Sequence, residues 1–298
     1  MKKYFLNAAT LTILLFVTGC TIQVERKVIH IVNPPFELSA TTRIPDLHDS
    51  LKIMQITDSH ISIEDEKESD FMVYGERMRK AYMNPRKHFS LDTSITTFDN
   101  LDNILLKAKS ENIDLLILTG DIVNFPSPAS VNYVYERLKR TGIQWLFISG
   151  NHDWHYEGME GTLDSLRNTW IDKSLLPLYN GHNPLYFSTV IHGINFVGID
   201  NSTGQVNEKQ VEFLQDQLKK KEPIILMSHI PYKLNTPEMS AITEIIVENS
   251  NKIVAILAGH IHKPSYFFTG NLCQYTSIAA FQGGSFTLNI KPKQPLPR

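Results

Sequence analysis

Residues 146–153 of this chain read Leu-Phe-Ile-Ser-Gly-Asn-His-Asp. The apolar part of this stretch, together with Trp145, has the length of a buried β-strand, and Gly150 ends that strand because glycine permits a turn that few other residues tolerate. An amide, an imidazole and a carboxylate follow: Asn151, His152 and Asp153. Such a junction can serve turn hydrogen bonding as well as chemistry, so its meaning depends on how the other strands end.

Four other apolar runs of strand length end in polar residues of the same kinds. These runs cover residues 51–56, 113–118, 224–227 and 253–257. The polar residues that follow them are Asp58 and His60, Asp121, His229, and His260 with His262. Each short motif is common by chance, and it is the set of five that carries weight.

The pattern between these runs predicts the architecture. Helical spacing of apolar residues occurs at 93–111, 130–140, 163–170, 205–221 and 241–248. Further strands are expected at 185–190, 194–199, 265–269, 272–280 and 285–290, the last three as antiparallel strands that end the sheet. Strands and helices therefore largely alternate, as in α/β proteins. Because ligands gather beyond the carboxyl ends of strands in such sheets, we expect the polar residues to converge at one edge.

The composition is that of a globular protein without an excess of charge. The 298 residues are 42% hydrophobic, enough for one large domain or two small ones, and no internal repeat or clear second domain is visible. The 29 basic and 31 acidic residues leave a formal charge of -2. The overall charge therefore gives no reason to expect a nucleic-acid partner, although a local basic patch is compatible with it.

The N-terminal residues resemble an export signal. Lys2 and Lys3 precede an apolar run at 11–17 that is too short to span a bilayer. The quartet Val17-Thr18-Gly19-Cys20 resembles the bacterial lipoprotein lipobox. That resemblance implies a signal peptide over 1–19, cleavage before Cys20 and a lipid on its thiol, which would anchor the protein at the bacterial cell envelope, outside the cytoplasm. An ordinary signal peptide with a chance cysteine is the alternative.

Two segments next to the predicted strands lack regular periodicity. Residues 20–50 contain interrupting prolines and are expected to form a tether with an edge strand near 28–32, so the main domain is expected to cover 51–298. Residues 61–90 are polar, aromatic and basic and follow a candidate ligand directly. They could fold over the site, where their cations would suit a phosphate, or form a solvated surface excursion. Cys273 is expected to be a buried apolar side chain without a disulfide partner.

The chemistry of the strand-end residues indicates a metal site. The set offers carboxylate, amide and imidazole groups and contains no cysteine. That combination suits a hydrolytic site for Mn, Fe, Zn or Co ions better than a closed structural zinc site. The five motifs, in this order, are similar to those of the calcineurin-like metallophosphoesterase family, and the resemblance extends over residues 51–290.

The resemblance implies an α/β fold, a layered β-sandwich flanked by helices, with two divalent metal ions. Carried over position by position, one ion would be held by Asp58, His60 and His262, the other by Asn151, His229 and His260, and Asp121 would bridge them. His152 would face the leaving oxygen or a phosphoryl oxygen, with Asp153 holding its protonated form.

The same resemblance implies an activity. Two cations about 3.5 to 4 Å apart can clamp a phosphoryl group and bring the pKa of bound water from about 15.7 towards about 7. The expected reaction is hydrolysis of a small phosphate mono- or diester by attack of a metal-bound hydroxide. The chain is similar to cyclic-nucleotide-type phosphodiesterases, while nucleotides, phosphorylated sugars and lipid head groups stay open as substrates. The alternative is a non-catalytic binding protein of the same fold at the cell envelope, and the complete ligand set favours the enzyme.

One position narrows the choice of metal. Purple acid phosphatases of the same superfamily carry a tyrosine three residues after the bridging aspartate, where it binds ferric iron, whereas this chain has Asn124. A purple ferric site is therefore not expected. Asn124 is expected to support Asp121 or Asn151 by a hydrogen bond, or to serve a turn.

Overall fold

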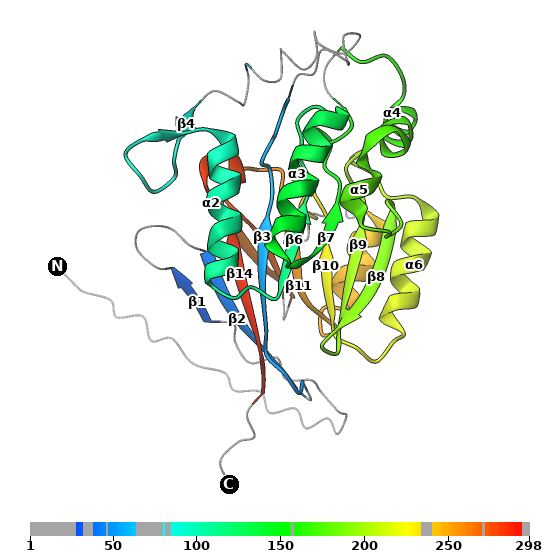
Figure 1. The fold of residues 1–298 in the computed structure, drawn as a ribbon. Helices are drawn as coiled ribbons and strands as arrows, with labels where there is room; N and C mark the ends of the chain where they lie inside the picture. Colours follow the sequence, from blue (N-terminus) through cyan, green and yellow to red (C-terminus); the bar gives the residue numbers. More distant parts are fainter. Residues whose placement is uncertain are drawn as a thin grey trace, which may run out of the picture.

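The computed structural model describes residues 28–31, 38–45, 47–63, 80, 85–155, 158–233, 240–269 and 272–293. In this part of the chain two six-stranded sheets face each other, and helices cover their outer sides (Figure 1). The strand order in the first sheet is β1 (Val28–Ile31), β2 (Leu38–Ile44), β14 (Phe286–Pro292), β3 (Leu51–Ile56), β6 (Leu115–Thr119) and β7 (Gln144–Ile148). The order in the second is β12 (Ser265–Thr269), β13 (Leu272–Thr276), β11 (Ile253–Ala258), β10 (Ile224–Met227), β9 (Ile194–Ile199) and β8 (Tyr186–Ile191).

β6 shows why the apolar runs form strands between two layers. All of its residues are buried. Leu115 and Ile117 belong to the cluster between the sheets, together with Met227 of β10, whereas Leu116 and Leu118 belong to the cluster beneath the helices. Successive side chains of a strand point to opposite faces, so a strand with a layer on each side needs an unbroken apolar run.

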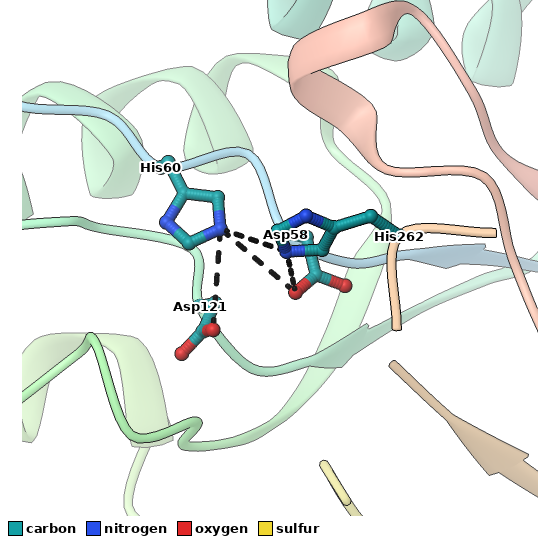
Figure 2. A group of neighbouring side chains, drawn as sticks. All are labelled: Asp58, His60, Asp121 and His262. Carbon is teal, nitrogen blue, oxygen red and sulfur yellow. Dashed lines mark hydrogen bonds and ion pairs between the residues drawn. The ribbon is translucent and has the colours of Figure 1, made fainter. Parts of the chain in front are cut away.

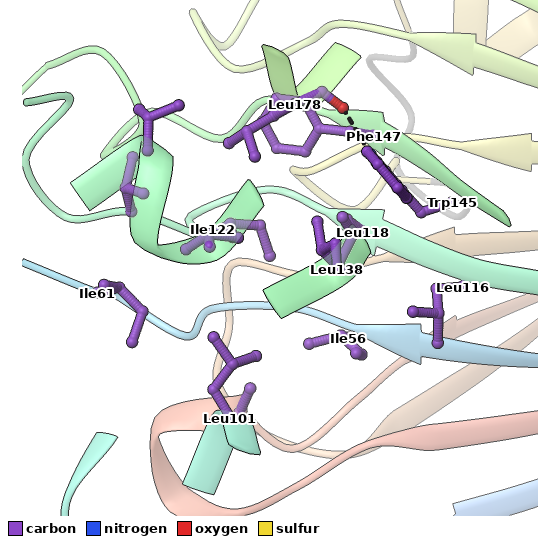
Figure 3. Close-up of a cluster of buried hydrophobic side chains, with 14 of the residues drawn as sticks. Ile56, Ile61, Leu101, Leu116, Leu118, Ile122, Leu138, Trp145, Phe147 and Leu178 are labelled. Atoms are coloured by element: carbon purple, nitrogen blue, oxygen red, sulfur yellow. Dashed lines mark hydrogen bonds between the residues drawn. The ribbon is translucent and has the colours of Figure 1, made fainter. Parts of the chain in front are cut away.

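Helices cover the outer face of each sheet. The cluster outside the first sheet includes residues of α2 (Thr97–Ser110), α3 (Pro128–Thr141), α4 (Leu163–Trp170), the π-helical turn Ile171–Leu175 and α5 (Leu176–Tyr179). Figure 3 shows Leu101 of α2 and Leu138 of α3 turned towards the strands, and the Trp145 indole N–H donates to the Leu178 carbonyl at 2.9 Å. α6 (Glu208–Leu218) and α7 (Ala241–Glu248) cover the second sheet. The predicted α/β sandwich flanked by helices is confirmed.

Two strands of the first sheet differ from the sequence prediction. β2 lies where a tether is predicted, yet it pairs in parallel with β14 and buries Ala40 and Thr42. β14 is predicted to lie beside β12 and β13, but it crosses to the first sheet and pairs antiparallel with β3. Phe286 and Leu288 of β14 point into the cluster between the sheets. Because both sheets face that core, the apolar pattern alone does not decide which sheet the strand joins.

Several predictions concern residues outside the described part of the chain: the signal peptide over 1–19, Cys20, and residues 64–79 and 81–84 of the 61–90 segment. The described end of that segment contains β4 (Arg86–Lys87), which pairs with β5 (Ser94–Ile95). Within the described ranges, no helix has the length and apolar character needed to cross a bilayer. The side chain of Cys273 is buried, as expected.

Candidate metal centre

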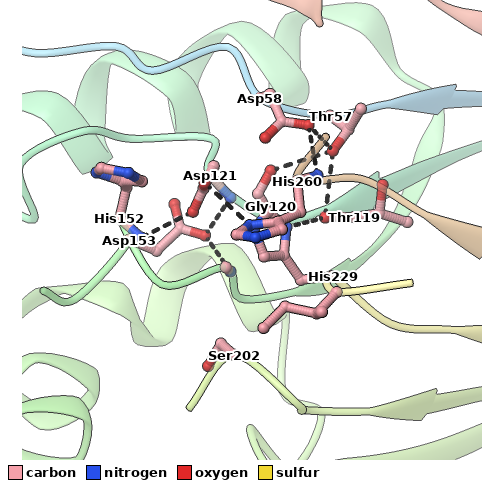
Figure 4. A network of polar contacts seen from close by, with 12 residues as sticks. Thr57, Asp58, Thr119, Gly120, Asp121, His152, Asp153, Ser202, His229 and His260 are labelled. Atoms are coloured by element: carbon pink, nitrogen blue, oxygen red, sulfur yellow. Dashed lines mark hydrogen bonds and ion pairs between the residues drawn. The ribbon is translucent and has the colours of Figure 1, made fainter. Parts of the chain in front are cut away.

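The parallel strands bring the predicted ligands to one edge of the two sheets. β3, β6 and β7 run parallel in the first sheet, and β9, β10 and β11 run parallel in the second. Their carboxyl ends meet across the sandwich, since the backbone N–H of His260, after β11, donates to Asp58 Oδ2, after β3, at 3.0 Å (Figure 4). Both sheets therefore deliver side chains to the same place.

Asp58, His60, Asp121 and His262 form a first group of ligand-type side chains (Figure 2). His60 Nε2 lies 3.3 Å from His262 Nε2 and 3.9 Å from a carboxylate oxygen of both Asp58 and Asp121. His262 Nε2 lies 3.1 Å from Asp58 Oδ1. Atoms that bind a common ion at about 2.1 Å lie roughly 3 Å apart, so this spacing suits one cation.

Asp121, His229 and His260 form a second group. His229 Nε2 lies 3.2 Å from Asp121 Oδ2, and the rings of His229 and His260 are 5.1 Å apart, edge to face. Asp121 belongs to both groups, as a bridging position requires. His260 is exposed and His262 is half-buried, so the loop after β11 forms the open side of the site.

Gly150 brings the loop after β7 against this second group. A Cβ on Gly150 would lie 2.2 Å from Asp121 Oδ1 and 2.7 Å from His229 Cε1, so only glycine allows this approach. The next residue is Asn151, the predicted amide ligand. The loop therefore runs past the second group, and binding of an ion by Asn151 stays a prediction.

Two of the histidines are oriented by hydrogen bonds to their Nδ1 atoms. His60 Nδ1 lies 2.8 Å from Asn124 Oδ1, and His229 Nδ1 lies 2.8 Å from the Thr119 carbonyl. Both partners are oxygens that only accept, so each Nδ1 carries a proton and each Nε2 keeps a lone pair in the neutral ring. Partners of this kind fix the ring of a metal-binding histidine. Asn124, predicted to support Asp121 or Asn151 or to serve a turn, is found to hold the ring of His60.

Unsatisfied buried atoms show that the site fits cations. Among the described residues, Asp58 Oδ1 and Asn151 Oδ1 accept no hydrogen bond, although His262 Nε2 lies 3.1 Å from the first. Asp58 Oδ2, by contrast, accepts from Thr57 Oγ1 at 2.6 Å and from His260 N (Figure 4). Buried polar atoms without partners are costly. Divalent cations would satisfy both of these oxygens.

The backbone of the site is held in an unusual conformation. Among the described residues, positive φ angles occur at eight that are not glycine, and five of these are predicted ligands: Asp58 (54°), His60 (48°), Asp121 (53°), His260 (72°) and His262 (55°). This left-handed region costs a non-glycine residue about 1 to 2 kcal/mol. Such strain gathers at functional sites, where surrounding structure enforces it. The fold thus holds these side chains against their backbone preference.

The electrostatics of the metal-free site pair a carboxylate with a protonated imidazole. Burial alone would lower the pKa of His229, but the adjacent Asp121 carboxylate raises it to about 10. Burial would likewise raise the pKa of Asp121, yet the positive charge of His229 holds it well below its usual range. His60 differs, because burial lowers its pKa to about 4. A cation that binds His229 near neutral pH must therefore displace a proton.

Asp153 joins the loop after β6 to the loop after β7. Its Oδ2 accepts from the backbone N–H of Asp121 at 2.8 Å and of Gly150 at 2.7 Å, and its Oδ1 accepts from Val123 N at 2.8 Å (Figure 4). Burial and the charge of Asp121 raise its pKa to about 8. These bonds give Asp153 a structural function that the sequence analysis does not foresee. The predicted support of His152 by Asp153 stays a prediction.

His152 lies beside the first group. Its backbone N–H donates to Asp121 Oδ1 at 2.7 Å, and its ring is 5.0 Å from the His60 ring, edge to face. The ring is thus near both aspartate and histidine ligands, as a residue that acts on the substrate would be. Trp154, two residues further on, is fully buried, and its indole N–H donates to Ser202 Oγ at 2.9 Å.

Phe281 is a residue of the site that the sequence analysis misses. It lies in the short helical turn Ala280–Gln282, whose backbone is tied to the loop after β3 because Phe281 N donates to the Asp58 carbonyl at 3.1 Å. Its ring centroid is 5.7 Å from that of His60 and 5.2 Å from that of His262. An apolar residue far along the chain carries no local signal of such a position.

Comparisons with known proteins agree with this geometry. A family model described as calcineurin-like phosphoesterase matches residues 51–264. The crystal structure of a dimetal phosphatase from Danio rerio is similar in fold, with a TM-score of 0.52 and 13% identity, over 78% of this chain and 88% of that chain.

Two curated relatives are similar in sequence. A protein of Psychrobacter sp. (strain PRwf-1) named "probable cyclic nucleotide phosphodiesterase" is 27% identical over 204 residues, which are 61% of this chain and 58% of that protein. A protein of Arcobacter nitrofigilis named "probable glycerophosphodiester phosphodiesterase" is 24% identical over 231 residues, 72% of each chain. The chain thus spans little more than half the length of the first of these relatives.

Proposed function

The chain belongs to the calcineurin-like phosphoesterase family, and we propose that it is a metal-dependent phosphoester hydrolase that acts on phosphodiesters at a dinuclear centre. The proposal rests on the membership of Asp121 in both ligand groups, each of which contains side chains from both sheets. The diester preference is supported by the names of the two relatives, both phosphodiesterases. A phosphate monoester is the second substrate class to test.

The proposed ligand sets follow the two groups. One ion would be held by Asp58, His60 and His262, the other by Asn151, His229 and His260, with Asp121 shared. When bound, two divalent ions stabilise phosphoryl charge and make water a nucleophile near neutral pH. The donor set of oxygens and imidazoles suits Mn, Fe, Zn or Co.

The residues of the chain would perform the rest of the reaction. Asp121 fixes the His152 backbone through a 2.7 Å hydrogen bond, so the His152 ring would stand in a set place beside the ligands. A protonated His152 would donate to the leaving oxygen of the ester. Phe281 excludes water from one side of His60 and His262, whereas the exposed His260 side admits substrate.

The direct test is a metal-dependent substrate panel. The chain is stripped with chelator, reconstituted separately with Mn, Fe(II), Zn and Co, and offered bis(p-nitrophenyl) phosphate, p-nitrophenyl phosphate, a cyclic nucleotide and a glycerophosphodiester. We expect metal-dependent hydrolysis of a diester. Two bound ions without hydrolysis of any of the four would instead favour the non-catalytic binding protein of the same fold.

The N-terminal quartet supports a second proposal, on location. We propose that a lipid on Cys20 anchors the protein at the bacterial cell envelope, outside the cytoplasm. Expressed in a bacterium, the wild-type chain should fractionate with membranes, and Cys20→Ala should leave that fraction. Equal membrane association of both proteins would refute the anchor.

A further inference from the structure

The end of β9 carries buried polar residues that belong to neither ligand group. Asp200, Asn201 and Ser202 follow the strand directly and are nearly inaccessible to solvent. The strand itself is fully buried and, apart from Asn195, apolar. Polar side chains in such a place need partners, and Asn201 and Ser202 find theirs in the loops that carry the predicted ligands.

The Asn201 side chain forms hydrogen bonds with the loop after β10. Its Oδ1 accepts from the backbone N–H of His229 at 3.1 Å and of Ile230 at 2.9 Å, and its Nδ2 donates to the Ile230 carbonyl at 2.7 Å. β10 ends at Met227, so these hydrogen bonds continue the attachment to β9 beyond the end of the ladder. The Asn201 side chain thus binds three backbone groups of the loop: the N–H of His229 and both the N–H and the carbonyl of Ile230.

The other sides of His229 are fixed as well. Gly259 N donates to the His229 carbonyl at 2.8 Å, from the loop after β11. The ring donates through Nδ1 to the Thr119 carbonyl, which leaves Nε2 towards Asp121. Asn201 therefore supplies the remaining constraint, the one from β9. Without Asn201, His229 would keep the hydrogen bond of its ring to Thr119 and that of its carbonyl to Gly259, but its backbone would no longer be bound to the end of β9.

The same strand end also holds the loop after β7. Ser202 Oγ accepts from the Trp154 indole N–H at 2.9 Å, and Ser202 N donates to Asp200 Oδ1 at 2.8 Å. Arg167 of α4 anchors the other Asp200 oxygen at 3.3 Å. Trp154 is three residues after Asn151. The two loops held by the end of β9 are thus those of His229 and Asn151, both assigned to the same ion.

We propose that Asn201 is a positioning residue for His229 and that the end of β9 adjusts the second metal position without contributing a ligand to it. The inference rests on the dinuclear assignment proposed above. Asn201 acts through the backbone, so its loss should weaken one of the two metal positions selectively. Removal of groups that orient a ligand typically costs about 10- to 100-fold in metal affinity.

The test is a Mn²⁺ titration of the whole chain by calorimetry, with an electron paramagnetic resonance readout of whether the bound ions are paired. Asn201→Ala should retain one strong position and lose about 10- to 100-fold in affinity at the other. The paired-ion signal should then give way to that of isolated Mn²⁺. Asn201→Asp keeps both acceptor bonds and should lie between Ala and wild type.

Asn195→Ala is the matched control. Asn195 is an asparagine of the same strand, fully buried at its opposite end, where its Nδ2 donates to Gln217 Oε1 at 3.3 Å. This variant should lower thermal stability and leave both Mn²⁺ positions unchanged. If Asn201→Ala does not fold, Asn201→Asp alone tests the inference. It should weaken Mn²⁺ binding at one of the two metal positions and leave binding at the other unchanged.

The outcomes separate this inference from the function on which it rests. If wild type binds two Mn²⁺ ions and both Asn201 variants bind them with unchanged affinity, or with an equal loss at both positions, the positioning inference is overturned alone. If wild type binds fewer than two ions, the dinuclear assignment fails, and this inference fails with it. Selective loss in the Asn201 variants, absent from Asn195→Ala, supports it.

Discussion

Asp121 Oδ2 lies 3.2 Å from His229 Nε2, and both side chains are fully buried. Asp121 follows β6 of the first sheet and His229 follows β10 of the second, so this contact joins the two halves of the sandwich. In the metal-free chain the contact is an ion pair, because the carboxylate keeps the imidazole protonated. With a cation bound, both atoms would become ligands. The site therefore exchanges a proton for a metal at its centre.

That exchange predicts a pH dependence of stability. The pKa of His229 rises from 6.5 to about 10 against the effect of burial, through Asp121, and that of Asp153 rises from 3.8 to about 8, mainly through burial. A group whose pKa is raised on folding contributes stability below its unfolded value and loses it as the pH rises through the folded value. The metal-free chain should therefore become less stable between pH 6.5 and about 10.

Added Mn²⁺ should oppose this loss. Its binding requires a neutral His229, so the affinity increases with pH and the ion stabilises the folded chain more at each step. Melting temperatures with chelator and with Mn²⁺, taken across the window, check both trends. A metal-free chain that becomes more stable as the pH rises would refute the ion pair.

Replacement of His152 should separate catalysis from metal binding. His152→Ala removes the proposed proton donor but no proposed ligand, so both ions should stay bound while kcat for a diester falls by about 10²- to 10⁴-fold. Elemental analysis and steady-state kinetics on the same preparation measure the two effects. Loss of metal on this substitution would show that His152 is itself a ligand.

Replacement of Asn124 should loosen His60. Its Oδ1 holds His60 Nδ1 at 2.8 Å, and Asn124→Ala should reduce metal affinity by about 10- to 100-fold. Asn103→Ala, at an exposed position of α2, is the control and should leave metal affinity unchanged. Equal affinities in both variants would mean that His60 needs no support from Asn124.

The substitution Gly150→Ala should disturb the metal centre through steric contact alone. The added Cβ would lie 2.2 Å from Asp121 Oδ1, so Gly150→Ala should reduce metal affinity and cost about 1 to 3 kcal/mol of stability. Gly142→Ala, where a Cβ meets nothing within 4 Å, should cost about 1 to 2 kcal/mol for its left-handed backbone and leave metal affinity unchanged. Calorimetric metal titration distinguishes the two. Normal metal binding by Gly150→Ala would argue against the tight approach.

Sequence reasoning found those parts of the site that carry a local pattern. Asp121 and His229 follow short apolar runs, and in parallel strands such positions share one edge, so their convergence could be predicted although they are 108 positions apart in the sequence. The layered fold followed from the same runs. Positions that depend on which strands become neighbours could not be derived in this way.

The residues that were missed act through long-range contacts. β2 and β14 pair across more than two hundred residues, as in the register Leu38 with Phe286, and neither segment indicates its partner. Asn124 carries an amide that suits many neighbours, and only the fold brings His60 to it. Phe281 is an apolar residue like many in the core. Phe281 contacts the predicted ligands His60 and His262 only because the turn Ala280–Gln282 is hydrogen-bonded to the backbone of Asp58.

We propose that one carboxylate, Asp121, is shared by two metal ions and that hydrolysis of a phosphoester depends on this pair. The most direct measurement is the number of Mn²⁺ ions per chain, determined by elemental analysis together with diester hydrolysis, for wild type and Asp121→Asn. We predict two ions and metal-dependent hydrolysis for wild type, and loss of paired binding and of hydrolysis for Asp121→Asn. Two bound ions and undiminished hydrolysis in Asp121→Asn would contradict the claim.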